Sequence, residues 1–235
     1  NIQTDYFATI GRMENVSDII PNDFALARGT SMATAFAGGS VLLLIQALTN
    51  DTWNAWQYSI ANVLKVKQIL LMTAWEIYKG PETGYIINRG GKDAVEGYGL
   101  IQVDAAVDAI KRILEINNSY LGYLSEDIFQ KHVWAGKIYL RENNTYLFRL
   151  TVPTGADMDL YLWDKDPNEW GEPVLLAKST RKGARDEYLA ITPSESGYYY
   201  VTIKLISGEG EFNLTIINVK SDRIEDITIS PASGS

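Results

Sequence analysis

The 235-residue sequence contains no cysteine and only one histidine, His132. The absence of cysteine excludes disulfides, thiolate catalysis and cysteine-ligated zinc. The single histidine is the one side chain here whose ordinary pKa suits a general base near neutral pH. Basic residues are also in the minority, because 21 Lys and Arg stand against 29 Asp and Glu, for a formal net charge of −8. This balance argues against nucleic acid and anionic membranes as partners, since both bind basic surfaces.

Long apolar runs and a leader sequence are missing as well. The longest apolar stretch, residues 41–48, is far shorter than the roughly 20 residues that cross a bilayer, so we expect a chain that is not transmembrane. No basic and then apolar leader follows Asn1, and we interpret this end as cut or processed. The lack of thermolabile cysteine and the presence of N-glycosylation sequons favour a secreted, thermostable glycoprotein. The five sequons begin at Asn15, Asn50, Asn117, Asn143 and Asn213.

The remaining composition supports two folded domains. Hydrophobic residues make up 46% of the chain, which is enough for sizeable cores. Apolar residues at helical spacing predict a buried helix over residues 31–48 and further helices over about 61–78 and about 104–113. After residue 117 the pattern changes to short runs rich in Tyr, Val, Ile and Leu that alternate with period two. This second pattern predicts an all-β sandwich or jelly roll of about eight strands.

These patterns divide the chain into four segments. Helices around a buried centre are typical of an α/β domain, which we assign to residues 1–117. Residues 118–134 are expected to be a linker, residues 135–220 the β-sandwich, and residues 221–235 a loose tail.

The stretch from Arg28 to Gly39, RGTSMATAFAGG, has the features of a nucleophile site. Gly29 allows a tight turn and the close approach of a substrate. Ser31 then lies at the start of a helix, where free backbone N–H groups can stabilise a developing oxyanion. The simpler interpretation is that Thr30 or Ser31 only caps the helix.

The residues GTSMA, from Gly29 to Ala33, resemble the active-serine motif of the subtilisin-like serine proteases, or subtilases. Two later stretches resemble the same family in the same order, VKQILLMTA at 66–74 and EGYGLIQVDAAVDAI at 96–110. The resemblance implies that residues 1–117 are the C-terminal part of a subtilisin-like α/β domain with a parallel sheet. It also implies that Ser31 is the catalytic nucleophile and that Gly29 and Thr30 bind substrate. Ala35 departs from the family, which usually has proline there.

The family's other catalytic residues are an aspartate, a histidine and an oxyanion-hole asparagine that precede the serine. Only thirty residues precede Ser31, none of them histidine, and His132 follows it. The chain alone is therefore expected to be catalytically incomplete. The resemblance implies a secreted protease whose N-terminal half, from the same precursor, supplies these residues for the hydrolysis of peptides. The alternative is a non-catalytic extracellular surface or assembly component that keeps a protease-like fold.

An acidic segment lies within the expected sandwich, TGADMDLYLWDKDPNEWG at 154–171. Such crowded oxygens favour calcium, which takes six to eight hard ligands. A solvated hairpin end on an acidic protein is the alternative. The wider region, residues 135–218, resembles the pre-peptidase C-terminal domain of bacteria and archaea, a β-sandwich whose related Asp-x-Asp strand lies near calcium. The predicted calcium ligands are Asp157, Asp159, Asp164 and Asp166.

Overall fold

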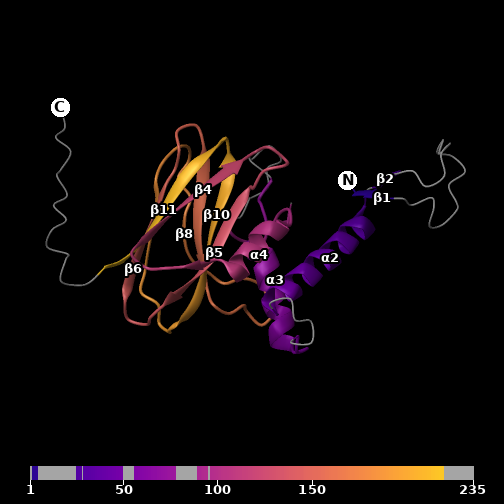
Figure 1. Cartoon of the computed structure of the whole chain (residues 1–235), viewed down its shortest axis with the longest axis horizontal. Coiled ribbons are helices and arrows are strands. Elements are labelled where there is room, and N and C mark those ends of the chain that lie inside the picture. Colours follow the sequence, from indigo (N-terminus) through magenta and orange to yellow (C-terminus); the bar gives the residue numbers. More distant parts are fainter. Residues whose placement is uncertain are drawn as a thin grey trace, which may run out of the picture. The chain divides into compact units, whose positions relative to one another are not determined.

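The structure is a computed structural model that describes residues 2–4, 25–27, 29–49, 56–77, 89–94 and 96–219, with side chains from residue 29 onward. The chain forms two compact units, residues 1–43 and residues 44–235, which are described separately (Figure 1).

The first unit contains a short antiparallel ladder and most of one helix. Strands β1 (Ile2–Thr4) and β2 (Ala25–Ala27) pair with each other, and α2 (Thr30–Leu48) follows. The predicted helix is confirmed, but it is not buried on all sides. Phe36, Leu42 and Leu43 are each at least half exposed, because no strand that covers them lies among the described residues. Of the helices described, only α2 is long and apolar enough to cross a membrane by length and composition, a test that core helices also pass.

Two helices of the second unit follow from local sequence signals. Helix α3 (Ile60–Met72) starts after Ser59, whose hydroxyl accepts a hydrogen bond from the N–H of Asn62 and so caps the helix. It ends at Thr73, several residues earlier than the sequence predicted, because Trp75 forms an extended bridge with Leu100. Helix α4 (Val103–Lys111) buries Ala105, Ala106, Ala109 and Ile110.

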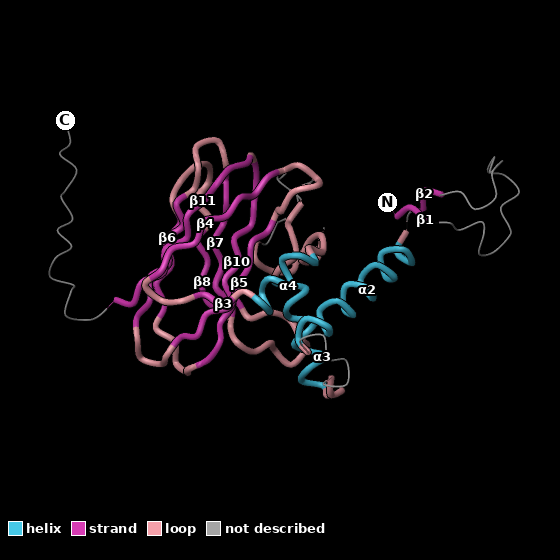
Figure 2. Tube along the Cα trace, in the orientation of Figure 1, coloured by secondary structure: helices cyan, strands magenta, loops and turns pink. Residues whose placement is uncertain are grey.

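The rest of the second unit is a β-sandwich of two sheets (Figure 2). One sheet has the order β3-β5-β10-β7-β8 and the other β4-β11-β6-β9. All neighbouring strands in the two sheets pair antiparallel except β3 and β5, which are parallel. The strands are β3 (Ile113–Leu114), β4 (Asn118–Ser125), β5 (Val133–Leu140), β6 (Thr145–Thr151), β7 (Asp157–Trp163), β8 (Leu175–Ser179), β9 (Glu187–Ile191), β10 (Gly197–Ser207) and β11 (Glu209–Val219).

The core between the sheets is apolar and continuous. It contains Phe148, Leu160, Val201, Ile203 and Leu214, which are all fully buried. Alternating strand residues supply this core from both sheets, as period-two patterning requires. The predicted β-sandwich is thus confirmed.

The boundary between the predicted segments needs a correction. Residues 118–134, expected as a linker, include β4, which pairs along its whole length with β11. The alternation in β4 is hidden because Leu121 and Tyr123 are apolar but point outward, at 68% and 47% exposure. Gly122 packs against the ring of Phe212, and a Cβ at this position would lie 2.4 Å from that ring. The close contact therefore favours glycine at residue 122. The tail 221–235 lies outside the described residues.

A pair of glycines tests the bridge that ends α3. Gly99 has φ +105°, and a Cβ there would lie 2.1 Å from the carbonyl oxygen of Trp75, whereas Gly155 has φ +91° with open space around it. We expect Gly155→Ala to cost about 1 kcal/mol from backbone strain and Gly99→Ala about 3 kcal/mol or more, because the bridge must also open. Urea unfolding measures both values. Equal losses for the two variants would contradict this account of the bridge.

Candidate functional site

Ser31 lies in the first turn of α2 and its side chain is exposed. The carbonyl of Gly29 accepts hydrogen bonds from the N–H groups of Met32 and Ala33, each at 3.1 Å. The residue whose carbonyl accepts the first helical bonds is the N-cap, so Gly29 holds that position and Ser31 is inside the helix. The capping interpretation of Thr30 or Ser31 therefore has no support in this geometry.

The turn before Ser31 depends on the glycine. Gly29 has φ +143°, a conformation that residues with a Cβ rarely adopt. Thr30 is exposed beside it, and its carbonyl accepts a hydrogen bond from the hydroxyl of Thr34 at 2.9 Å. The first N–H groups of a helix lack an acceptor within the helix and carry its positive dipole end. The exposed hydroxyl of Ser31 thus lies beside backbone N–H groups that can donate hydrogen bonds to a negatively charged oxygen.

His132 is enclosed within the second unit. His132 is only 5% exposed, and its ring stacks on the ring of Trp75 with the two centroids 3.9 Å apart. Its Nδ1 atom lies 3.4 Å from Oε1 of Gln102. A general base must reach the hydroxyl that it deprotonates. These contacts fit a packing role for the imidazole better than the role of a base for a substrate site.

The four aspartates predicted to bind calcium do not share one environment. Asp159 is fully buried, where its Oδ2 atom meets Arg89 at 3.4 Å and the hydroxyl of Tyr161 at 2.9 Å. Asp166 is exposed and pairs with Lys165 at 2.5 Å. Asp157 is half-buried on β7, and Asp164 follows that strand.

The residues present fit a calcium site poorly. Within the described part of the chain no group of three or more Asp, Glu or His side chains is placed to hold a metal ion. Two of the four aspartates also have cationic partners, as described above, and a cation beside them would have to displace these. Calcium binding stays a prediction, and no step of the proposed function depends on it.

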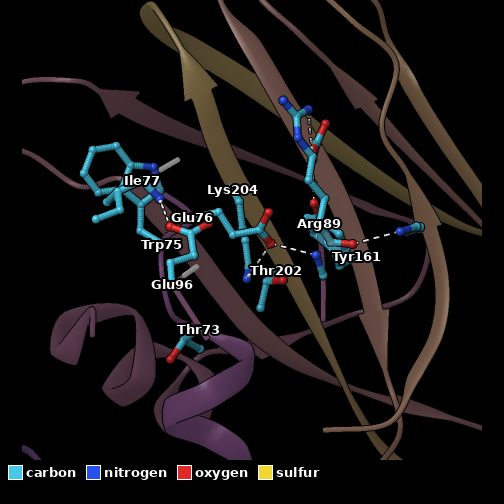
Figure 3. A network of polar contacts seen from close by, with 12 residues as sticks. Thr73, Trp75, Glu76, Ile77, Arg89, Glu96, Tyr161, Thr202 and Lys204 are labelled. Atoms are coloured by element: carbon cyan, nitrogen blue, oxygen red, sulfur yellow. Dashed lines mark hydrogen bonds and ion pairs between the residues drawn. The ribbon is translucent and has the colours of Figure 1, made fainter. Parts of the chain in front are cut away.

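A polar cluster on the outer face of the five-stranded sheet was not predicted from the sequence (Figure 3). Lys204 of β10 is 1% exposed, and its ammonium lies 3.4 Å from Oε1 of Glu76, which is itself 5% exposed. The same Glu76 oxygen accepts a hydrogen bond from the N–H of Gly90 at 2.7 Å. Lys204 shares its face of β10 with Thr202, whose hydroxyl accepts a bond from the indole of Trp163.

Burial dominates the electrostatics of this cluster. Removal from water lowers the pKa of Lys204, against the opposing effect of Glu76. Burial raises the pKa of Asp159 to about 7, although Arg89 and the Tyr161 hydroxyl act in the opposite direction. One oxygen of Asp159, Oδ1, is buried without a hydrogen-bond partner. A buried carboxyl with one unpartnered oxygen holds a proton more readily, because protonation removes the desolvation cost of its negative charge.

One protein-family model matches part of the chain. Residues 11–100 match the model of the subtilase family, which is 90 of the 235 residues and includes Ser31. The same range includes α3 and the segments 73–77, 89–94 and 96–100 of the second unit. No curated protein matches the chain.

Several solved structures resemble part of the chain weakly. One is the pre-peptidase C-terminal domain of collagenase from Bacillus anthracis, with 15% identity, 45% of this chain and 92% of that chain covered, and a TM-score of 0.37. Another is CorA, a surface-associated copper-binding protein of Methylomicrobium album BG8, with 11% identity and a TM-score of 0.35. The match covers 46% of this chain and 97% of that chain. A third is PliG of Aeromonas hydrophila, a periplasmic lysozyme inhibitor, with 7% identity and a TM-score of 0.32. The match covers 46% of this chain and 95% of that chain. The assignment of a β-sandwich here depends on the strand pairing and not on these scores.

The raised pKa of Asp159 predicts an unusual pH dependence of stability. Between about pH 4 and about pH 7 the folded protein keeps a proton on this carboxyl that the unfolded chain has lost. The contribution of Asp159 to the free energy of unfolding therefore falls as the pH rises through that range and is constant above it. We expect Asp159→Asn, which does not titrate, to remove this fall. Urea unfolding at several pH values measures the slope for both proteins.

Asp186 provides a control of the opposite sign. Its hydrogen bonds from Arg149 lower the pKa of this carboxyl, so its contribution is present near neutral pH and is lost only as the pH falls through that lowered value. We therefore expect Asp186→Asn to leave the slope between about pH 5 and about pH 7 unchanged. The same slope in Asp159→Asn and the parent protein would contradict the raised pKa.

Proposed function

We propose that this chain supplies the nucleophilic serine of a secreted subtilisin-like endopeptidase. The single observation that carries the proposal is the position of Ser31, an exposed hydroxyl in the first turn of α2 within the range that matches the subtilase family. Gly29 and Thr30 would line the path of the substrate beside it. The hydroxyl oxygen would lose its proton to a base and attack the scissile carbonyl, and the helix N-terminus would stabilise the oxyanion of the tetrahedral intermediate. Cleavage of the C–N bond would then release the amine, which takes up that proton, and leave an acyl-enzyme that water hydrolyses.

A base for Ser31 is the second requirement. A serine hydroxyl is a weak nucleophile until a neighbouring base takes its proton. The contacts of His132 with Trp75 and Gln102 argue against this residue as the base. In the proposal, the histidine, its aspartate and an oxyanion-hole asparagine come from an N-terminal part of the same precursor. The half-exposed apolar side chains of α2, Phe36, Leu42 and Leu43, support a partner of this kind, since subtilase helices pack on a central sheet.

Secretion is part of the same proposal. The sequon residues Asn117 and Asn143 are exposed in turns, both with φ close to +60°, so an oligosaccharide at either would not disturb the core. Asn15 and Asn50 lie outside the described residues. No feature of the described residues favours the alternative of a non-catalytic assembly component.

A fluorophosphonate probe tests the proposal, because it reacts covalently with a serine activated by a base. We expect the native protein, with its N-terminal part present, to be labelled on the peptide that carries Ser31. Ser31→Ala should abolish both labelling and peptide hydrolysis, while its free energy of unfolding changes by no more than about 0.5 kcal/mol, since the side chain is exposed.

Ser40→Ala on the same helix is the matched control. Its hydroxyl is buried and donates to the carbonyl of Phe36 at 2.9 Å, so the variant should keep the label. Absence of labelling at Ser31 with the complete protein would refute the protease and leave the assembly component.

A further inference from the structure

The outer face of the five-stranded sheet is covered by two segments of the family-matched range. Residues 73–77 follow α3, and residues 89–90 lie beside Tyr161 of β7 (Figure 3). Fully buried aromatic side chains lie beneath them, Tyr161 and Trp163, whose rings stack with the centroids 5.8 Å apart. Burial of such rings supplies the main favourable free energy of the contact, but it does not select which segment covers them.

The first selective contact is the pair between Lys204 and Glu76. The lysine belongs to the sheet and the glutamate to the covering segment, with 3.4 Å between their charged atoms. The ammonium also lies 5.4 Å from the ring centroid of Tyr161 and 5.7 Å from that of Trp163. Asp159 is the cross-strand partner of Lys204 and also meets Arg89, so a covering segment without Glu76 would leave two cations with one carboxylate in this cluster, which is strongly unfavourable.

The second selective contact has the opposite polarity. Here the cation, Arg89, belongs to the covering segment, and the carboxyl group of Asp159, which is an anion above about pH 7, belongs to the sheet, with 3.4 Å between them. Lys178 of β8 donates to the carbonyl of Arg89 at 2.8 Å. Gly90 follows with φ +78°, and a Cβ there would lie 2.6 Å from the ring of Tyr161. The segment therefore fits against the sheet only with glycine at this position.

A third contact fixes the end of α3. The indole N–H of Trp75 donates to the carbonyl of Leu205 at 2.8 Å, one residue after Lys204 on β10. Its ring stacks on His132, which is itself bonded to β10 because its carbonyl accepts from the N–H of Leu205. Trp75 and Glu76 thus hold consecutive residues of the covering segment against consecutive residues of one strand.

We propose that this sheet face is an internal docking surface, and that the stable folding of residues 60–77 and 89–110 depends on its two ion pairs of opposite polarity. The two pairs form one cluster, because Lys204 and Asp159 are cross-strand partners on β10 and β7, and the covering segments supply the carboxylate and the guanidinium that meet them. The sandwich is then the platform on which the C-terminal part of the family-matched range folds. This inference does not depend on whether Ser31 is a nucleophile.

Hydrogen exchange followed by mass spectrometry tests the proposal on the full chain. We expect Lys204→Met, which leaves Glu76 buried without its cation, to speed exchange in residues 60–77 and 89–110 by about 100-fold. Glu76→Gln should act in the same direction and keeps an acceptor for the N–H of Gly90. The milder Glu76→Gln carries the test if Lys204→Met does not fold. Exchange in β6 and β11 of the other sheet should stay within about twofold of the parent.

The double variant identifies the pair as the cause. Once one partner is gone, the second substitution removes no attraction, so the combined effect of Lys204→Met and Glu76→Gln should be far smaller than the product of the single effects. Arg149→Met is the matched control, since its pair with Asp186 lies exposed on the other sheet and should leave residues 60–77 unchanged.

Two results would overturn the proposal. Unchanged exchange of residues 60–77 in both single variants would mean that the ion pairs do not hold the segment. An equal rise in residues 60–77 and in strands β6 and β11 would mean that the sandwich is no independent platform and that the whole unit opens together.

Discussion

The burial of Lys204 is the constraint on which the second unit depends. Its ammonium lies on an aromatic sheet face that water does not reach, and such a charge requires an anion in contact. Glu76 meets this requirement only because α3 ends at Thr73 and the chain then runs along β10 in extended form. The end of α3, the bridge between Trp75 and Leu100 and the cover of the sheet therefore lie together around one buried charge.

The two parts of the contact have different physical roles. Aromatic burial supplies most of the favourable free energy, whereas the buried charges require matching charged partners at a considerable cost of desolvation. The raised pKa of Asp159 is the visible sign of this cost, since Arg89 does not fully compensate the loss of water. A structure that selects its docking partner in this way resembles a specific protein interface more than a flexible joint between two domains.

The sequence predicts the elements better than their contacts. Period-two alternation identified the sandwich, and helical spacing identified α2, α3 and α4, because both signals are local. β4 was missed because Leu121 and Tyr123 hide its alternation. Lys204 was missed for a related reason. On an alternating strand it lies on the outer face with Tyr200 and Thr202, which normally means solvent, and only the tertiary structure shows that Glu76 covers it. Ser31 was predicted as a nucleophile from a contiguous motif, and this stays a prediction, whereas Asp159 was predicted to bind calcium and pairs with Arg89 in the structure.

The docking surface joins the C-terminal part of the family-matched range to the sandwich within the second unit. The family-matched range extends from the first unit, across α2, into residues that fold on the sandwich. Residues anchored in this way cannot be separated from the sandwich by a cut after residue 117 without exposing Trp163, Tyr161 and Lys204 together. The exposed apolar surface would then oppose the solubility of both pieces.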